Sequence, residues 1–118
     1  MDINRIVNNI KQFDFSRIDI DCFLDERDSD VFGNEWNEIY RQINQDLIPA
    51  DIRQLSDNLR REVFLELDKK LGASDMSEYI SDDIELLIFS DYLNIHSEWL
   101  SKFIEIYEEG HLPTGKII

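Results

Sequence analysis

The sequence predicts an all-α fold, a single-domain bundle of about five helices over residues 1–118. Apolar residues recur every three to four positions along nearly the whole chain, which is the period of one helix face. Only four Gly and two Pro occur in 118 residues, too few for the frequent turns of a sandwich or barrel. The hydrophobic content of 42% is sufficient for one core.

The first helix is predicted over residues 3–13. Its apolar residues form a single stripe, and Asp2 is placed to cap its first turn. The stripe consists of Ile3, Ile6, Val7, Ile10 and Phe13. Residues 15–30 follow no clean helical period, so we expect an irregular or short helical connector there.

The second and third helices are predicted on either side of Pro49. The second opens at Gly33 or Asn34, and Pro49 ends it because proline suits the first position of the next helix. Its inward residues would be Trp36, Ile39, Tyr40, Ile43 and Leu47. The third has Asp51 in its first turn, where the helix dipole favours an anion, and it stops at Gly72. Its stripe is Ile52, Leu55, Leu59, Val63, Leu67 and Leu71.

The fourth helix is predicted to lie at the centre of the bundle. Asp75 and Glu78 have the spacing of a capping box. The run Leu86–Phe89 is apolar around most of the helix circumference, which is typical of a buried helix. Its inward residues would be Met76, Tyr79, Ile80, Ile84, Leu87, Ile88 and Tyr92.

A fifth helix is predicted near the end of the chain. Asn94 or Ser97 would cap it, and Gly110 would stop it. Its inward residues would be Trp99, Leu100, Phe103, Ile106 and Tyr107. Residues 111–118 would then form a short tail.

The chain is strongly acidic, with 26 acidic and 12 basic side chains and a net charge of -14. Such a charge repels nucleic acid and anionic lipid, so neither is expected as a direct partner, and it speeds encounters with basic proteins. Residues 73–110 hold ten acidic side chains and one basic side chain, Lys102, whereas residues 1–72 hold 16 and 10. We therefore expect a cationic partner at the last two helices. Solubility alone is the alternative explanation.

Two groups of carboxylates are the candidate partner-binding residues. One group stands in a predicted loop before the second helix, where it is interrupted by Arg27, and binding residues concentrate on loops. The other lies on the last two helices. The candidates are Asp25, Glu26, Asp28, Asp30, Asp82, Asp83, Glu85, Asp91, Glu98 and Glu105. A solvated turn and a solvated helix face are the alternatives.

No pattern predicts catalysis, a metal site or a cofactor. The acidic loop resembles a calcium loop, but Phe32 and Ile39 stand where oxygen ligands belong. His96 and His111 have no metal-ligand spacing with each other or with Cys22. A single cysteine fits a reducing compartment. The beginning of the chain does not resemble a signal peptide, so we expect a cytoplasmic protein.

Two segments resemble bacterial toxin-immunity proteins. They are the stretch Arg27-Asp-Ser-Asp-Val-Phe-Gly-Asn-Glu-Trp36 and the ending Ile104-Glu-Ile-Tyr-Glu-Glu-Gly-His-Leu-Pro-Thr-Gly115. The similarity is to immunity proteins of contact-dependent growth inhibition systems and related polymorphic toxins. It implies a small cytoplasmic protein that binds one cognate toxin domain tightly and blocks it. Many such toxins are nucleases with basic clefts, and the resemblance implies no catalytic residues.

Charge and resemblance lead to the same functional hypothesis. The chain would be an immunity protein that neutralises a toxin domain, a nuclease, with carboxylates standing in for the phosphates of the substrate. An acidic helical adaptor or regulatory subunit that binds another basic protein is the alternative. A small enzyme that uses Cys22 is a third hypothesis, and nothing in the sequence places a histidine and an acid beside that thiol.

Overall fold

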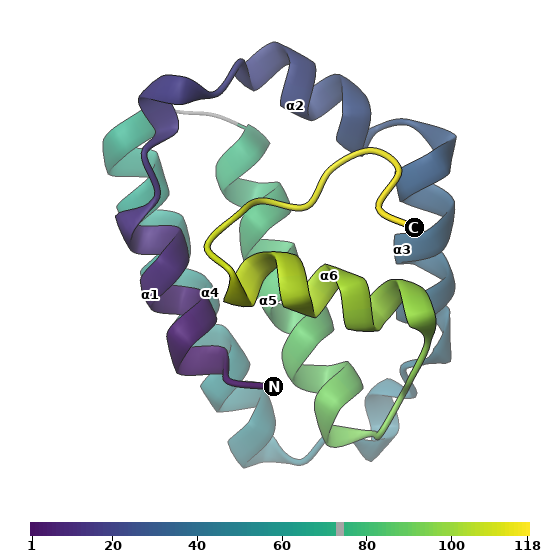
Figure 1. Cartoon of the computed structure of the whole chain (residues 1–118). Coiled ribbons are helices and arrows are strands. Elements are labelled where there is room, and N and C mark those ends of the chain that lie inside the picture. Colours follow the sequence, from purple (N-terminus) through teal and green to yellow (C-terminus); the bar gives the residue numbers. More distant parts are fainter. Residues whose placement is uncertain (73–74) are drawn as a thin grey trace.

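The computed structural model describes residues 1–72 and 75–118, which form six α-helices and two short 3-10 helices (Figure 1). The elements are α1 (Ile3–Gln12), η1 (Phe15–Arg17), α2 (Ile20–Arg27), α3 (Asp30–Gln42), η2 (Gln45–Leu47), α4 (Ala50–Leu71), α5 (Asp75–Tyr92) and α6 (Glu98–Glu108). The described ranges contain no strand. The all-α prediction is confirmed, with six helices in place of about five.

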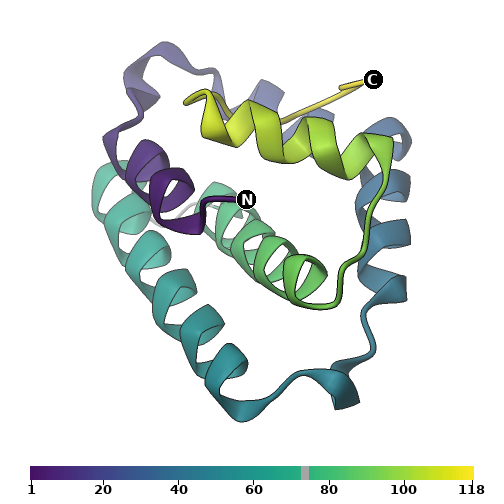
Figure 2. The same cartoon turned by 60° about the horizontal axis from the view of Figure 1, so that its bottom comes forward.

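The other helices are arranged around an antiparallel hairpin of α4 and α5, which make the most extensive helix–helix contact. On one side of this hairpin, α1 packs against α4 and α6, and on the other side α2 and α3 pack against α5. Figure 2 shows α6 running across the molecule on the side of α5 away from η2. The first and the last helix of the chain therefore lie in contact.

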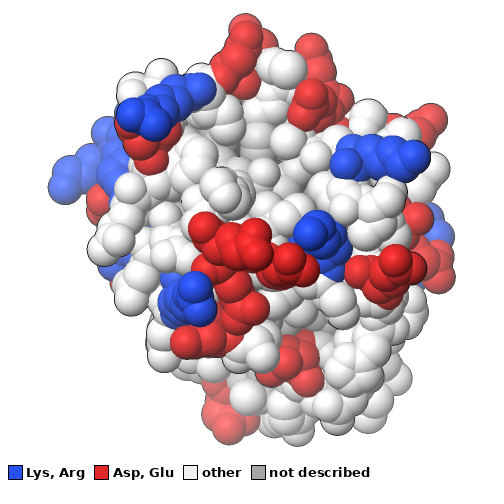
Figure 3. Space-filling view, viewed as in Figure 1, with Lys and Arg blue, Asp and Glu red and all other residues white. Residues whose placement is uncertain are grey.

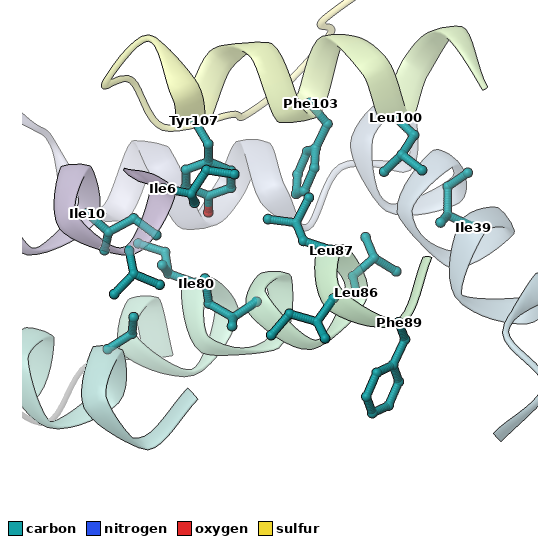
Figure 4. Packing of buried hydrophobic residues seen from close by; sticks show 14 of the residues in the cluster. Ile6, Ile10, Ile39, Ile80, Leu86, Leu87, Phe89, Leu100, Phe103 and Tyr107 are labelled. Carbon is teal, nitrogen blue, oxygen red and sulfur yellow. The ribbon is translucent and has the colours of Figure 1, made fainter. Parts of the chain in front are cut away.

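α5 is the central helix, as the sequence predicts. Its buried apolar residues are Met76, Ile80, Ile84, Leu86, Leu87, Ile88 and Phe89. Figure 4 shows Leu87 facing Phe103 of α6, and Ile80 on the side where Ile10 of α1 lies. Burial of one such side chain contributes about 1.5–3 kcal/mol to folding. The prediction that Tyr92 faces inward is wrong, because its side chain is 45% exposed.

Side-chain caps fix where several helices begin. The caps of α1, α2, α3 and α6 are Asp2, Asp19, Ser29 and Ser97, and each accepts a hydrogen bond from an amide in the first turn of its helix. Such a cap contributes about 1 kcal/mol. The predicted cap Asp2 and one of the two alternatives for α6, Ser97, are confirmed.

The segment between α1 and α4 differs most from the prediction. Within the expected connector, residues 20–27 form α2, a two-turn helix with its own cap, and this is the sixth helix. α3 begins at Asp30 and not at Gly33 or Asn34, because Ser29 caps it. It also ends at Gln42, well before Pro49.

Three residues that were predicted to face the core from this region and from α4 are exposed. Leu47 lies on η2 and is 60% exposed, while Tyr40 and Leu55 are 38% and 42% exposed. Pro49 is the N-cap residue of α4 and does not occupy its first helical position. The predicted stop at Gly72 is confirmed, since Gly72 is the C-cap of α4 with a φ of +70°.

α5 begins at Asp75 itself, so Asp75 is a helical residue and not the predicted cap. The residue before it lies outside the described ranges. After α6, residues 111–118 run back between α6 and α2 towards α3 (Figure 1), where Leu112 and Ile117 pack against the core. Across residues 1–72 and 75–118, no helix is sufficiently long and apolar to span a membrane.

Candidate partner-binding surface

Asp83 is the one predicted surface carboxylate that lies in the interior, with no exposed side-chain area. Arg27 of α2 donates to both of its oxygens, with Nη1–Oδ2 at 3.0 Å and Nη2–Oδ1 at 2.6 Å. The Tyr107 hydroxyl and the Trp36 indole N–H also donate to it, at 2.5 Å and 2.9 Å. A buried carboxylate requires such partners. Asp83 is therefore a structural residue, and its predicted surface position is wrong.

Arg27 is almost as deeply buried, with 5% of its side-chain area exposed. Its guanidinium carbon lies 4.3 Å from the centroid of the Phe32 ring and 5.5 Å from that of Phe23. Burial acts to lower the pKa of Arg27, but Asp83, through its charge and hydrogen bonds, and Tyr107 together outweigh it, so that this pKa is raised. Burial, followed by the charge of Asp83, raises the pKa of Tyr107 well above its ordinary value. At neutral pH the site thus holds one ion pair and a protonated tyrosine.

Asp82 and Glu85 share a cation from the neighbouring helix. Arg60 of α4 lies 2.8 Å from Asp82 Oδ1 and 3.8 Å from Glu85 Oε1. Partial burial raises the pKa of both carboxyls, and the charge of Arg60 opposes that rise. The sequence predicted that no basic side chain would neutralise these two carboxylates. This prediction is wrong, because Arg60 of α4 supplies one positive charge for the two.

The other seven candidate carboxylates are exposed. Six form no ion pair with a nitrogen–oxygen distance up to 4 Å among the residues that the structure describes. These six are Asp25, Glu26, Asp28, Asp30, Asp91 and Glu98. Glu105 is the exception, because it lies 3.3 Å from Lys102 on the same helix. Exposed pairs of this kind contribute little to stability, so most of the charge at these positions is open to a partner.

The first carboxylate group is not on a loop. Asp25 and Glu26 lie in α2, Asp28 follows it directly, and Asp30 is the first residue of α3. Space-filling atoms of acidic side chains gather in the middle of the face over α6 and again over α2 at its upper edge (Figure 3). We call the exposed carboxylates of α6 and of the α2–α3 junction the acidic surface, and they are Asp25, Glu26, Asp28, Asp30, Glu98 and Glu105. Asp91, near the end of α5, lies outside this set.

A recess of about 300 Å³ opens between the α2–α3 junction and α5. Its lining includes Arg27, Asp28, Phe32, Trp36, Tyr79 and Asp82. The sequence placed the indole of Trp36 inward, but it is half-buried at the edge of the core. That ring stacks on Tyr40 with 5.4 Å between centroids. On the opposite wall the Tyr79 hydroxyl donates to Asp28 at 2.5 Å, and this hydrogen bond raises the pKa of Tyr79 to about 12.

The sequence did not predict this recess. The residues that line it lie on or next to three helices. Of these residues, only Asp28 and Asp82 were candidates for partner binding. Arg27 was the one sequence signal for this site, because it is a single basic residue among four carboxylates. The charge pattern alone was interpreted as an acidic group interrupted by one basic residue. The structure shows that Arg27 instead lines the recess, with its guanidinium over the Phe32 ring.

A comparison with protein families adds one observation to this geometry. The family model described as immunity protein PIM1 matches residues 2–114. The matched range includes the first segment that resembles toxin-immunity proteins, all of the second except its last residue, Gly115, and all ten candidate carboxylates. No curated protein matches the chain.

Proposed function

The chain belongs to the immunity protein PIM1 family, and from this membership we propose that it binds and neutralises one cognate bacterial toxin domain, a nuclease, through its acidic surface. The toxin would belong to a contact-dependent growth inhibition system or a related polymorphic toxin system. The protein would act in the cytoplasm of the cell that it protects, by binding and without catalysis. The resemblance of the two sequence segments to toxin-immunity proteins is confirmed at the level of the family.

The observation that carries the nuclease target is the set of exposed carboxylates without basic partners. A nuclease must hold the phosphates of its substrate, and it does so with Lys and Arg in its cleft. Carboxylates presented to that cleft match the charge of the phosphates and steer the encounter. On the acidic surface, five of the six carboxylates are exposed and have no ion-pair partner among the described residues, so their charge acts on the surrounding solvent.

Tight binding also needs anchors that leave water on association. Aromatic side chains most often supply them at interfaces. Tyr40 is 38% exposed and is stacked on the half-buried Trp36. The stack is held in place before binding, so little side-chain entropy is lost on association. We propose that charge sets the association rate and that these rings slow dissociation.

The test uses the cognate toxin domain, which is first sought among the products of the neighbouring genes. Co-production of the wild-type chain should restore growth, and the purified chain should block cleavage of DNA or RNA by the toxin. A chain with Asp25→Asn, Glu98→Gln and Glu105→Gln should bind the toxin at least about tenfold more weakly, because three charges of the steering field are gone.

The matched control removes three exposed carboxylates from η2 and α4, with Asp46→Asn, Asp51→Asn and Asp57→Asn. It should keep wild-type affinity. Equal losses in both variants would overturn the acidic surface as the interface. A wild-type chain that neither binds the toxin nor restores growth would overturn toxin neutralisation itself. A toxin that stops growth without cleaving DNA or RNA would overturn the nuclease assignment.

A further inference from the structure

We propose that the recess between the α2–α3 junction and α5 binds an arginine side chain of the toxin. The inference rests on the proposed function and names the chemistry of the partner at one point of the interface. The recess has room for one long side chain, at about 300 Å³, which is the lower end of the range for small-molecule sites. A whole helix or strand would not fit there.

The walls of the recess combine aromatic rings with carboxylates. Trp36 and Tyr79 present their rings to the cavity, and Asp28 and Asp82 present carboxylates. A guanidinium is planar, stacks on aromatic faces and donates paired hydrogen bonds to carboxylates. A lysine ammonium is a compact and strongly hydrated charge that uses such faces less well. The combination therefore favours arginine.

The charge of the recess is negative, although Arg27 forms part of its lining. Asp83 already neutralises Arg27 through two hydrogen bonds. Arg60 divides one charge between Asp82 and Glu85, and Asp28 is in no ion pair among the described residues. An incoming cation would thus meet uncompensated carboxylate charge on a partly desolvated wall, where charge attraction is stronger than in open solvent.

Neighbouring carboxylates extend this negative field beyond the rim. Asp75 acts on Tyr79, and Glu78 acts on Asp82, through their charges. Both of these acids are exposed. They would draw a cationic side chain towards the mouth of the recess before it makes direct contact.

The walls are held in position by contacts within the chain. The Trp36 indole N–H donates to Asp83 at 2.9 Å, and the Tyr79 hydroxyl donates to Asp28 at 2.5 Å. These bonds fix both rings before a ligand arrives. A site that is already ordered loses less entropy on binding, which supports a recess built for a ligand.

The direct test is a titration of the full chain with a capped tri-arginine peptide, followed by the two indole N–H signals in NMR spectra. The Trp36 signal should move, and the signal of Trp99, which is buried at 3% exposure, should not. A capped tri-lysine peptide should bind at least about fivefold more weakly. A stationary Trp36 signal, or equal binding of the two peptides, would overturn the proposal.

Two variants locate the binding. Asp28→Asn with Asp82→Asn should weaken tri-arginine binding at least about tenfold, while Asp46→Asn with Asp51→Asn removes the same charge elsewhere and should change it less than twofold. Gly33 borders the recess on α3, and a Cβ there would meet its nearest neighbour, the Arg27 carbonyl oxygen, at an ordinary 3.9 Å. Gly33→Gln should therefore fill the recess and abolish binding without altering charge or fold. Retained binding in either recess variant would overturn the proposal.

The toxin itself separates this inference from the proposed function. If the wild-type chain and Gly33→Gln bind the toxin equally well, the arginine site falls and neutralisation stands. If the recess binds tri-arginine as expected but the wild-type chain does not bind the toxin, the proposed function falls and the recess remains a guanidinium site.

Discussion

The Asp83 carboxylate accepts four hydrogen bonds from side chains of three other helices. Its partners Arg27, Trp36 and Tyr107 are widely separated in sequence, so this one carboxylate holds α2, α3 and α6 against α5. A buried ion pair of this kind adds less to net stability than hydrophobic packing would, but the loss of one partner leaves the other charged and unpaired. The arrangement fixes the positions of the helices relative to one another.

We therefore expect Asp83→Asn to lower the free energy of unfolding by about 3–5 kcal/mol. The reason is that the Arg27 guanidinium would remain buried without a counter-charge. Urea unfolding followed by circular dichroism measures the loss. Asp91→Asn, an exposed position two turns later on α5, is the control and should change the value by less than about 0.5 kcal/mol. Similar values for the two variants would contradict the structural role of Asp83.

The sequence contained a signal for the burial of Asp83 that charge counting concealed. Asp83 follows Ile80 by three residues and precedes Leu87 by four, so it lies within the apolar stripe of α5. Asp82, its neighbour, points about 100° away and reaches the boundary with α4. The partner of Asp83 could not be predicted, because Arg27 is 56 residues away in sequence and only tertiary packing brings them together.

At the scale of the elements, the end of α4 depends on one backbone conformation. Gly72 ends α4 with φ +70° and ψ -164°, a region that is open almost only to glycine. A Cβ at this position would meet no atom within 4 Å. Any cost of a side chain there is thus a cost of backbone strain and not of crowding.

Gly72→Ala should accordingly lower the free energy of unfolding by about 1–3 kcal/mol. Gly33→Ala is the comparison, because Gly33 lies inside α3 with ordinary helical φ, and alanine is favoured over glycine there by about 1 kcal/mol. Thermal unfolding of the two variants should therefore shift in opposite directions. A shift of both variants in the same direction would refute the assignment of strain to Gly72.

The long helices could be predicted and the short ones could not, for a physical reason. α4, α5 and α6 each repeat their apolar spacing over at least three turns, and this period appears in the sequence. α2 has two turns and only Phe23 buried among its apolar residues, so caps and tertiary contacts determine it. Leu47 was assigned to the core for the same reason. It lies on the 3-10 helix η2, whose three residues establish no period that the sequence could reveal.

At the scale of the whole molecule, the distribution of charge matters more than its total. The net charge is -14, but Arg27 and Arg60 withdraw Asp83, and in part Asp82 and Glu85, from the field outside. The carboxylates that remain exposed on the last two helices and at the α2–α3 junction define the field that a partner meets. The predicted excess over the last two helices is thus smaller at the surface than in the sequence.

This field should control how fast the toxin arrives. We expect the association rate constant, measured by stopped-flow fluorescence, to fall at least about tenfold between 0.05 and 0.5 M salt, because screening shortens the range of exposed charges to a few ångströms. The dissociation rate constant should change much less. An association rate that stays flat over this range would show that long-range attraction plays no part.

The contact between α1 and α6 has a consequence for biosynthesis. Ile6 and Ile10 of the first helix share the core with Phe103 and Tyr107 of the last, so a ribosome has released nearly the entire polypeptide before the interior can close. Helices that have already emerged must wait, with apolar faces uncovered, for their final neighbour. Protection of the cell would then start only with finished chains, and a prematurely terminated product would be a substrate for proteases and not a weaker inhibitor.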